Sequence, residues 1–160
     1  MNYLTWIDAD TNRARFVAIQ PGWTTADIAQ RLRAAFPGGI DKANNLAIRD
    51  GATLPPDHDF NRAWEISGGN VVVNIAKARA VARRRIEAMR DTQRPRVLAL
   101  RRAAQLLSDA AALAAADNEI AAWQNILGNA ALDNAASIAD LRPLITAAEA
   151  LMPASGGPPN

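Results

Sequence analysis

Hydrophobic and polar positions alternate through the first part of the chain. Residues 3–20 are rich in strand-forming residues on either side of the polar stretch 8–12, which predicts a β-hairpin. Thr24 or Thr25 then stands where a helix cap is expected. The helix that follows has one apolar face, made of Ile28, Leu32, Ala35 and Phe36.

Residues 45–49 repeat the alternation and predict a short third strand, and residues 52–60 are interpreted as a loop. Residues 64–74 predict a second hairpin with Gly68-Gly69 at its tip. The order of hairpin, helix, strand and hairpin indicates a small α+β docking domain of β-grasp-like type over residues 1–73.

From residue 74 to residue 116 the apolar period changes to that of a helix. On a helical wheel the apolar stripe occupies a sector about 80° wide, which is typical of a seam for a partner helix. Pro95 predicts a kink or break near residues 90–94. The residues of the stripe are Ile75, Ala82, Ile86, Met89, Gln93, Val97, Leu100, Ala104 and Leu107.

A second helix is expected to start at Asp117 and to stop at Gly128, which makes residues 74–128 a long basic helix with a helical hairpin. Residues 129–152 predict a C-terminal helix with Pro143 in its first turn. Residues 153–160 have the composition of a flexible tail. The predicted class is therefore α+β, with sheets in the first half and helices in the second.

Positive charge is concentrated on the long helix. Residues 74–116 carry ten basic residues against three acidic ones, a net charge of +7, whereas the whole chain has a net charge of +2. A basic face follows the apolar stripe and consists of Arg79, Arg83, Arg90, Arg94 and Arg101. We favour ion pairing and solvation of this face over an acidic partner protein, and either of these over nucleic acid, because no aromatic residues are interleaved with the arginines. Acidic residues downstream are expected to come near this face when the chain folds back, namely Asp117, Glu119, Asp133 and Asp140.

Several functional classes lack the residues they need. The chain has no cysteine, and no apolar run approaches the roughly 20 residues of a transmembrane helix. The first residues do not have the pattern of a signal peptide. His58, the single histidine, is interpreted as part of a solvated loop. We therefore expect a protein made in a cytoplasm that is not an enzyme and has no catalytic, metal-binding or cofactor-binding residues.

Between Leu54 and Arg90 a proline-acidic loop and a Phe-x-x-Ala-Trp hairpin lead into an Ala-Arg helix. This pattern resembles that of a family of short proteins of tailed bacteriophages and prophages, from the tail and tail-fibre region. The resemblance extends to Pro153, but the expected Gly-Asp turn between the helices is replaced by Ala116-Asp117. The matching positions in the first stretch are Pro56, Asp57, Phe60, Ala63, Trp64, Val71, Val73, Ala76, Lys77, Ala78, Arg79, Arg84 and Arg90.

The resemblance implies a non-catalytic structural component of a phage virion, associated with the tail or tail fibre. Its partners would be other phage structural proteins and further copies of itself, with no membrane. Two alternatives stay open: an assembly chaperone absent from the mature particle, and a minor virion protein that contacts DNA. The apolar seam and the second helix, whose apolar residues are expected to face it, add the predicted partner or oligomer contacts, namely Ile86, Leu100, Leu107, Ile120, Trp123 and Leu127.

Overall fold

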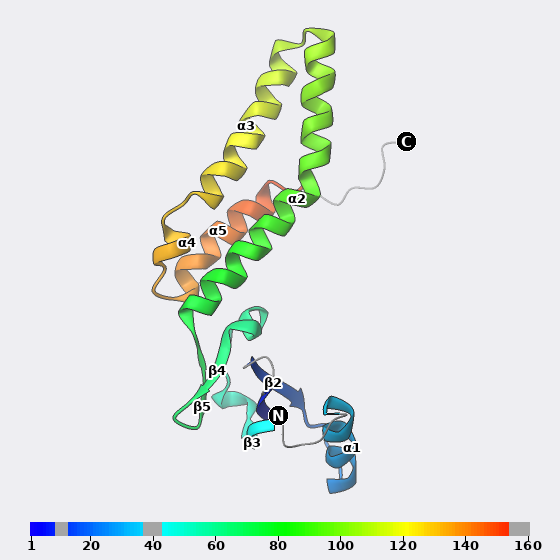
Figure 1. Ribbon diagram of the computed structural model, residues 1–160, viewed down its shortest axis with the longest axis vertical. Helices are drawn as coiled ribbons and strands as arrows, with labels where there is room; N and C mark the ends of the chain where they lie inside the picture. The colour runs from blue at the N-terminus through cyan, green and yellow to red at the C-terminus, as the bar shows by residue number, and fades with distance from the viewer. Residues whose placement is uncertain (9–12, 37–42, 154–160) are drawn as a thin grey trace. The chain divides into compact units, whose positions relative to one another are not determined.

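The computed structural model describes residues 1–8, 13–36 and 43–153 (Figure 1). The chain divides into two compact units, Met1–Ala78 and Arg79–Asn160. The first contains small antiparallel sheets with a helix, and the second contains most of the long helix together with a helical hairpin. The predicted α+β class is confirmed. The predicted tail lies outside the described residues apart from Pro153.

The first hairpin is present as predicted. Strands β1 (Asn2–Asp8) and β2 (Arg13–Ala18) pair antiparallel, and β3 (Ala43–Asp50) joins the other edge of β1 to give the order β2-β1-β3. One polar side chain is buried in this sheet without being left unsatisfied. The hydroxyl of Thr5 donates to the carbonyl of Ala47 at 3.3 Å and accepts from Nε of Arg49 at 2.8 Å.

Helix α1 (Thr25–Ala35) begins where the capping residues predicted it. Thr24 and Asp27 form a reciprocal capping box, and the hydrogen bonds from the Thr24 backbone and side chain hold the pKa of Asp27 below its usual range. Ile28 and Leu32 pack against a small core of Leu4, Trp6 and Phe36.

The stretch predicted as a loop contains two short 3₁₀ segments, Gly51–Thr53 and His58–Ala63. These segments lead into the second hairpin, in which β4 (Trp64–Ser67) and β5 (Asn70–Val73) pair antiparallel. The two glycines at its tip have φ values of +56° and +82°, which explains why glycine is needed there.

The two sheets of the first unit meet around Trp64. Its ring centroid lies 5.0 Å from that of Phe16 on β2 and 5.4 Å from that of His58. Leu54 and Val71 complete this second core. The element order that suggested a β-grasp-like domain is observed, and within it the strands form two separate antiparallel sheets.

The long helix is shorter than predicted. Helix α2 spans Ile75–Leu107 and α3 spans Ala110–Leu127, so the turn lies at residues 108–109 and the predicted start at Asp117 is wrong. Asp109 caps α3 by accepting from the backbone N–H of Ala112 at 2.9 Å. Ser108 has a φ of +53°, and the N–H of Asp109 reaches the carbonyl of Ala104 at 2.9 Å. These are the features of a Schellman ending with serine in the usual glycine position.

Pro95 does not break α2, which runs through it. Figure 1 shows the axis of α2 changing direction along its length, as expected for an internal proline that removes one backbone donor. The predicted kink is therefore present, while the helix stays continuous.

The C-terminal segment contains α4 (Ala131–Asn134) and α5 (Ile138–Ala150). A capping box between Ser137 and Asp140 starts α5, and hydrogen bonds from the Ser137 side chain and backbone lower the pKa of Asp140. Because this cap sets the first residue, Pro143 is the sixth residue of α5 and not in its first turn as predicted.

Ser108→Gly is expected to stabilise the protein by about 0.5–1 kcal/mol, because glycine adopts positive φ without the steric cost that a Cβ imposes. Urea unfolding followed by the helical signal measures the change. Ser108→Ala keeps a Cβ and is the matched control, for which we expect a change of less than about 0.5 kcal/mol. Equal effects of the two substitutions would contradict the explanation.

Candidate functional site

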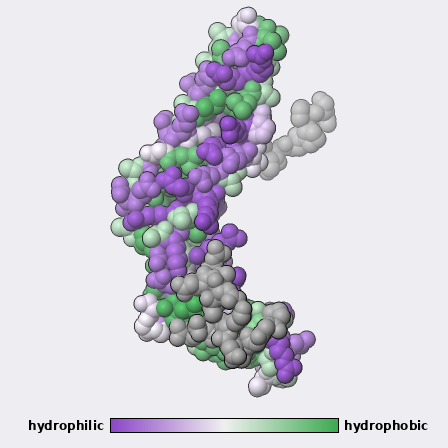
Figure 2. Space-filling view, viewed as in Figure 1, coloured by the Kyte–Doolittle hydropathy of each residue, from purple (hydrophilic) through white to green (hydrophobic). Residues whose placement is uncertain are grey.

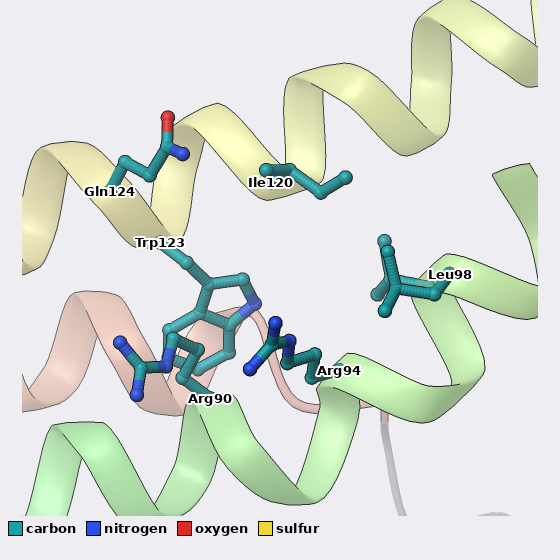
Figure 3. Close-up of a pocket in the computed structure, with 7 residues that line it drawn as sticks. Arg90, Arg94, Leu98, Ile120, Trp123 and Gln124 are labelled. Carbon is teal, nitrogen blue, oxygen red and sulfur yellow. The ribbon is translucent and has the colours of Figure 1, made fainter.

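A pocket of about 350 Å³ lies between α2 and α3 in the C-terminal unit (Figure 3). Three of its lining residues are aliphatic and two carry a guanidinium group, so it combines apolar surface with positive charge. The lining residues are Arg90, Arg94, Val97, Leu98, Ile120, Trp123 and Gln124.

Helical spacing brings these side chains together. On α2, Arg90, Arg94 and Leu98 follow one another at intervals of four residues and therefore share one side of the helix. On α3, Ile120 and Gln124 are also four residues apart, with Trp123 between them. Two side-chain rows, one from each helix, thus face the same space.

Ion pairs join the same two helices along α2. Nη2 of Arg96 contacts a carboxylate oxygen of Glu119, and Nε of Arg101 donates to Asp117 at 2.6 Å. Arg96 also donates through Nε to the buried Gln93 at 2.9 Å, which satisfies the one polar residue of the stripe. Because the charged groups of both pairs are partly exposed, each pair is worth at most about 1 kcal/mol.

The two cations of the pocket differ in their partners. Arg90 donates through Nε and Nη2 to the neighbouring Asp91, at 2.9 and 2.7 Å. Arg94 is exposed and, within the described part of the chain, makes no hydrogen bond or ion pair. The guanidinium of Arg94 is therefore a positive charge available to a ligand.

Trp123 contributes a second donor without an acceptor. The residue is 4% exposed, and its Nε1 is buried without a hydrogen-bond partner, as are those of Trp6 and Trp64 among the described residues. In Figure 3 the nitrogen-bearing edge of the Trp123 ring faces Arg94. A buried indole N–H normally has an acceptor, so this side of the pocket has two donors and needs an acceptor.

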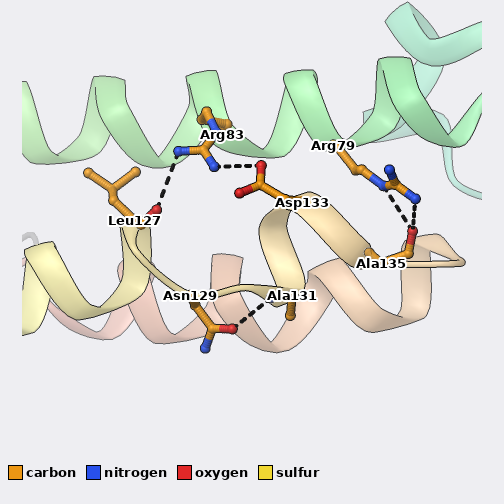
Figure 4. A network of polar contacts seen from close by, with 7 residues as sticks. All are labelled: Arg79, Arg83, Leu127, Asn129, Ala131, Asp133 and Ala135. Carbon is orange, nitrogen blue, oxygen red and sulfur yellow. Dashed lines mark hydrogen bonds and ion pairs between the residues drawn. The ribbon is translucent and has the colours of Figure 1, made fainter.

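The first half of α2 uses its arginines differently. Arg79 donates twice to the carbonyl of Ala135, at 2.9 and 2.7 Å, and Arg83 donates to the carbonyl of Leu127 at 3.3 Å and to Asp133 at 2.8 Å (Figure 4). These bonds join the segment that contains α4 to α2. Two basic-face residues thus have acceptors within their own chain.

The predicted folding back of acidic residues is confirmed for three of them. Asp117, Glu119 and Asp133 each meet an arginine of α2, whereas Asp140 caps α5. Four of the five arginines of the predicted basic face have a partner, namely Arg79, Arg83, Arg90 and Arg101. The fifth, Arg94, has none among the described residues.

The predicted contact residues fall into three groups. Ile86 and Trp123 are buried inside the unit, and Ile120 and Leu127 are half-buried. Leu100 and Leu107 are 52% and 79% exposed. Whether the six contact a partner stays a prediction, but the assignment of Leu100 and Leu107 to the seam within the hairpin is wrong.

The reason lies in the small residues of the stripe. Beyond Pro95 its buried positions are Val97 and Ala104, seven residues apart, and α3 contributes the buried Ala116. Such small side chains allow the helices to approach closely. Leu100 and Leu107 lie about 60–80° away from Val97 on the helical wheel, and they stay at the edge of this contact.

The described residues carry no sign of a metal site. Within residues 1–8, 13–36 and 43–153 no group of three or more His, Asp or Glu side chains is placed to bind a metal ion. His58 packs against the Trp64 ring. In the same ranges, none of the helices combines the length and the hydropathy needed to cross a bilayer.

Comparison of this chain with protein-family models, curated proteins and solved structures gave no match. The resemblance to tailed-phage proteins thus rests on the residues quoted above and stays a prediction.

Sequence reasoning missed the pocket, although part of the signal was present. Arg90, Arg94 and Leu98 are spaced at four residues, as are Ile120 and Gln124, but the register that brings the rows together depends on where the turn falls. The carbonyl acceptors of Arg79 and Arg83, at Ala135 and Leu127, were missed because backbone carbonyls have no sequence signature.

Proposed function

We propose that this protein is a non-catalytic structural component of a tailed bacteriophage virion, associated with the tail or tail fibre, and that it acts by protein–protein docking and helix association. The phage context is drawn from the resemblance of residues 54–153. One observation carries the mode of action: the large exposed hydrophobic side chains among the described residues of the C-terminal unit are all on the second half of α2. They are Leu98, Leu100, Leu106 and Leu107.

These four leucines are 46–79% exposed. Figure 2 shows hydrophobic surface at the end of the hairpin that α2 and α3 form. Large exposed hydrophobic side chains gathered in one segment are typical of an interaction site, because burying one leucine side chain contributes about 1.5–3 kcal/mol. We define Leu100, Leu106 and Leu107 as the leucine tip and infer that it packs against another protein molecule.

The arginines support a protein partner over DNA. A phosphate-binding face needs cations that are free to reach the backbone of the nucleic acid, but Arg79, Arg83 and Arg101 are bonded within the chain. The N-terminal unit adds a second apolar surface, since Leu46 and Ile48 are exposed on the edge strand β3. This surface fits the proposed docking role of residues 1–73.

Leu100→Asp with Leu107→Asp is expected to convert a self-associated wild type into folded monomers, because a charged side chain cannot be buried without a partner. Light scattering at about 100 μM protein gives the molar mass, and circular dichroism checks that the helices remain. Ala99→Asp with Gln105→Asp is the matched control, since these exposed positions carry the same added charge on the same stretch of α2. A monomeric wild type, or an equal effect of the control, would overturn self-association through the leucine tip.

The place of action is tested separately, by mass spectrometry of purified particles of the phage whose genome carries this chain. The proposal expects the protein at a fixed number of copies per particle. Its absence from finished particles would overturn the structural role and favour an assembly chaperone.

A further inference from the structure

The pocket between α2 and α3 has features that packing of the hairpin does not use. The Arg94 side chain has no partner among the residues that the structure describes, and it lies beside Arg90, whose bond to Asp91 is exposed to solvent. An exposed pair of this kind is weak, so Arg90 is also available when a ligand offers a better acceptor. The cations of the pocket therefore favour an anionic ligand.

The indole of Trp123 narrows the chemistry of that ligand. Its buried Nε1 donor has no acceptor within residues 1–8, 13–36 and 43–153, and it lies on the side of the ring that faces Arg94 (Figure 3). A carboxylate has two oxygens and can therefore accept from both donors. Because Nε1 is buried, the carboxylate reaches it only when a neighbouring side chain moves. Arg94 is able to move with a bound carboxylate, since no described residue pairs with its guanidinium.

The aliphatic lining selects against a bare inorganic anion. Val97, Leu98 and Ile120 line the same pocket, and a phosphate ion would lose hydration against them without gaining a contact. An apolar group of about the size of a leucine side chain would instead bury these surfaces. The volume of about 350 Å³ is near the lower end of the range for ligand pockets, so the ligand is small.

We propose that this pocket binds a small carboxylate with an apolar body, with the carboxylate on Arg94 and Trp123 Nε1 and the apolar part against Val97, Leu98 and Ile120. The ligand is either a free carboxylic acid or the C-terminal residue of a peptide chain, which present the same chemistry. This proposal does not depend on the phage role or on the leucine tip.

The test is an NMR titration of the ¹⁵N-labelled full chain that follows the indole N–H signal of Trp123, assigned by its loss in Trp123→Phe. The probe is N-acetyl-leucine, and N-acetyl-leucinamide is the uncharged control. We expect the acid to shift this signal with a Kd of about 1 mM and the amide to bind at least about tenfold more weakly.

Two matched arginine variants test whether the positive charge of Arg94 binds the carboxylate. Arg94→Gln is expected to weaken N-acetyl-leucine binding at least about tenfold, while Arg102→Gln changes it less than about twofold. Arg102 is also an exposed arginine of α2 without a described partner, and it does not line the pocket. Both substitutions are on the surface, so neither is expected to unfold the chain.

A third arm separates the two sources of the ligand. A short peptide ending in leucine with a free carboxylate binds more tightly than N-acetyl-leucine if the source is a chain end, and no more tightly if it is a free acid. The proposal is overturned if acid and amide shift the Trp123 signal equally, if no probe shifts it at about 20 mM, or if Arg102→Gln weakens binding as much as Arg94→Gln. An equal shift by inorganic phosphate would also overturn it.

Discussion

Trp64→Ala is expected to destabilise the N-terminal unit by about 3–5 kcal/mol, one of the two largest effects of a single substitution that we predict. Trp64 is 1% exposed and joins the two small sheets through Phe16, with Leu54 and Val71 around it. A unit of this size has little other apolar contact to replace it. Urea unfolding monitored by ¹⁵N–¹H spectra gives the loss for each unit separately.

The control is Trp23→Ala, which removes the same side chain from a half-buried site. Trp23 lies under the guanidinium of Arg31 at 5.3 Å, and we expect a cost of about 1–2 kcal/mol. Trp64→Phe is informative as well, because it removes an indole N–H that has no partner in the described part of the chain and keeps a ring between the sheets. We expect it to cost less than half as much as Trp64→Ala.

The spectra also test whether the units are independent. If Met1–Ala78 and Arg79–Asn160 fold separately, Trp64→Ala lowers the unfolding midpoint of signals from the first unit and leaves that of α5 unchanged. A single transition that moves equally for both units would contradict this. So would an equal cost for Trp64→Ala and Trp23→Ala.

Local signals predicted the N-terminal helix and strands because capping residues and turn glycines mark where these elements begin and end. The capping box of Thr24 and Asp27 and the two glycines between β4 and β5 are readable as residues. Strand β3 was also predicted, although its partner was not. The pairing of β3 with β1 depends on which edge a distant strand reaches, and the sequence does not carry that information locally.

The turn between α2 and α3, in contrast, could not be located from local sequence signals. Residues 103–116 are rich in alanine, so helix propensity is high on both sides of the true turn and does not locate it. Asp109 and Asp117 both fit the start of a helix, and the family resemblance favoured Asp117. The structure uses Asp109, which follows a serine at positive φ. An eight-residue difference then decides which side chains meet across the hairpin.

That difference also explains the candidate site. Trp123, Ile120 and the arginines were singled out from the sequence, but their grouping around a pocket depends on the register between α2 and α3. The same register buries Trp123 and leaves Leu107 exposed. Residue types were therefore predictable, while their neighbours were not.

Leu132→Ala is expected to destabilise the C-terminal unit by about 2–5 kcal/mol, the other large effect. Leu132 has no exposed surface and belongs to the four-residue helix α4, which packs against α5. So short a helix has little stability of its own. Its place must then be held either by the buried leucine or by the polar contacts of Arg79 and Arg83 (Figure 4).

Magnitudes favour the leucine. Asp133 is 70% exposed in its pair with Arg83, and such pairs contribute less than about 1 kcal/mol. Arg83→Gln is therefore expected to cost at most about 1 kcal/mol, well below Leu132→Ala. Leu98→Ala, at a leucine of α2 that is 46% exposed and lies outside the leucine tip, is the control for loss of the same side chain and is expected to cost less than about 1 kcal/mol.

Urea unfolding of the three variants, followed by the helical signal, decides between the two ways of holding α4. If Arg83→Gln costs as much as Leu132→Ala, the polar contacts and not apolar burial hold α4 in place. Raising the salt concentration to about 1 M separates the contribution of the ion pair from that of the buried leucine, because screening weakens the exposed ion pair and leaves the leucine contact intact. We expect the Leu132→Ala difference to persist at high salt and the Arg83→Gln difference to shrink.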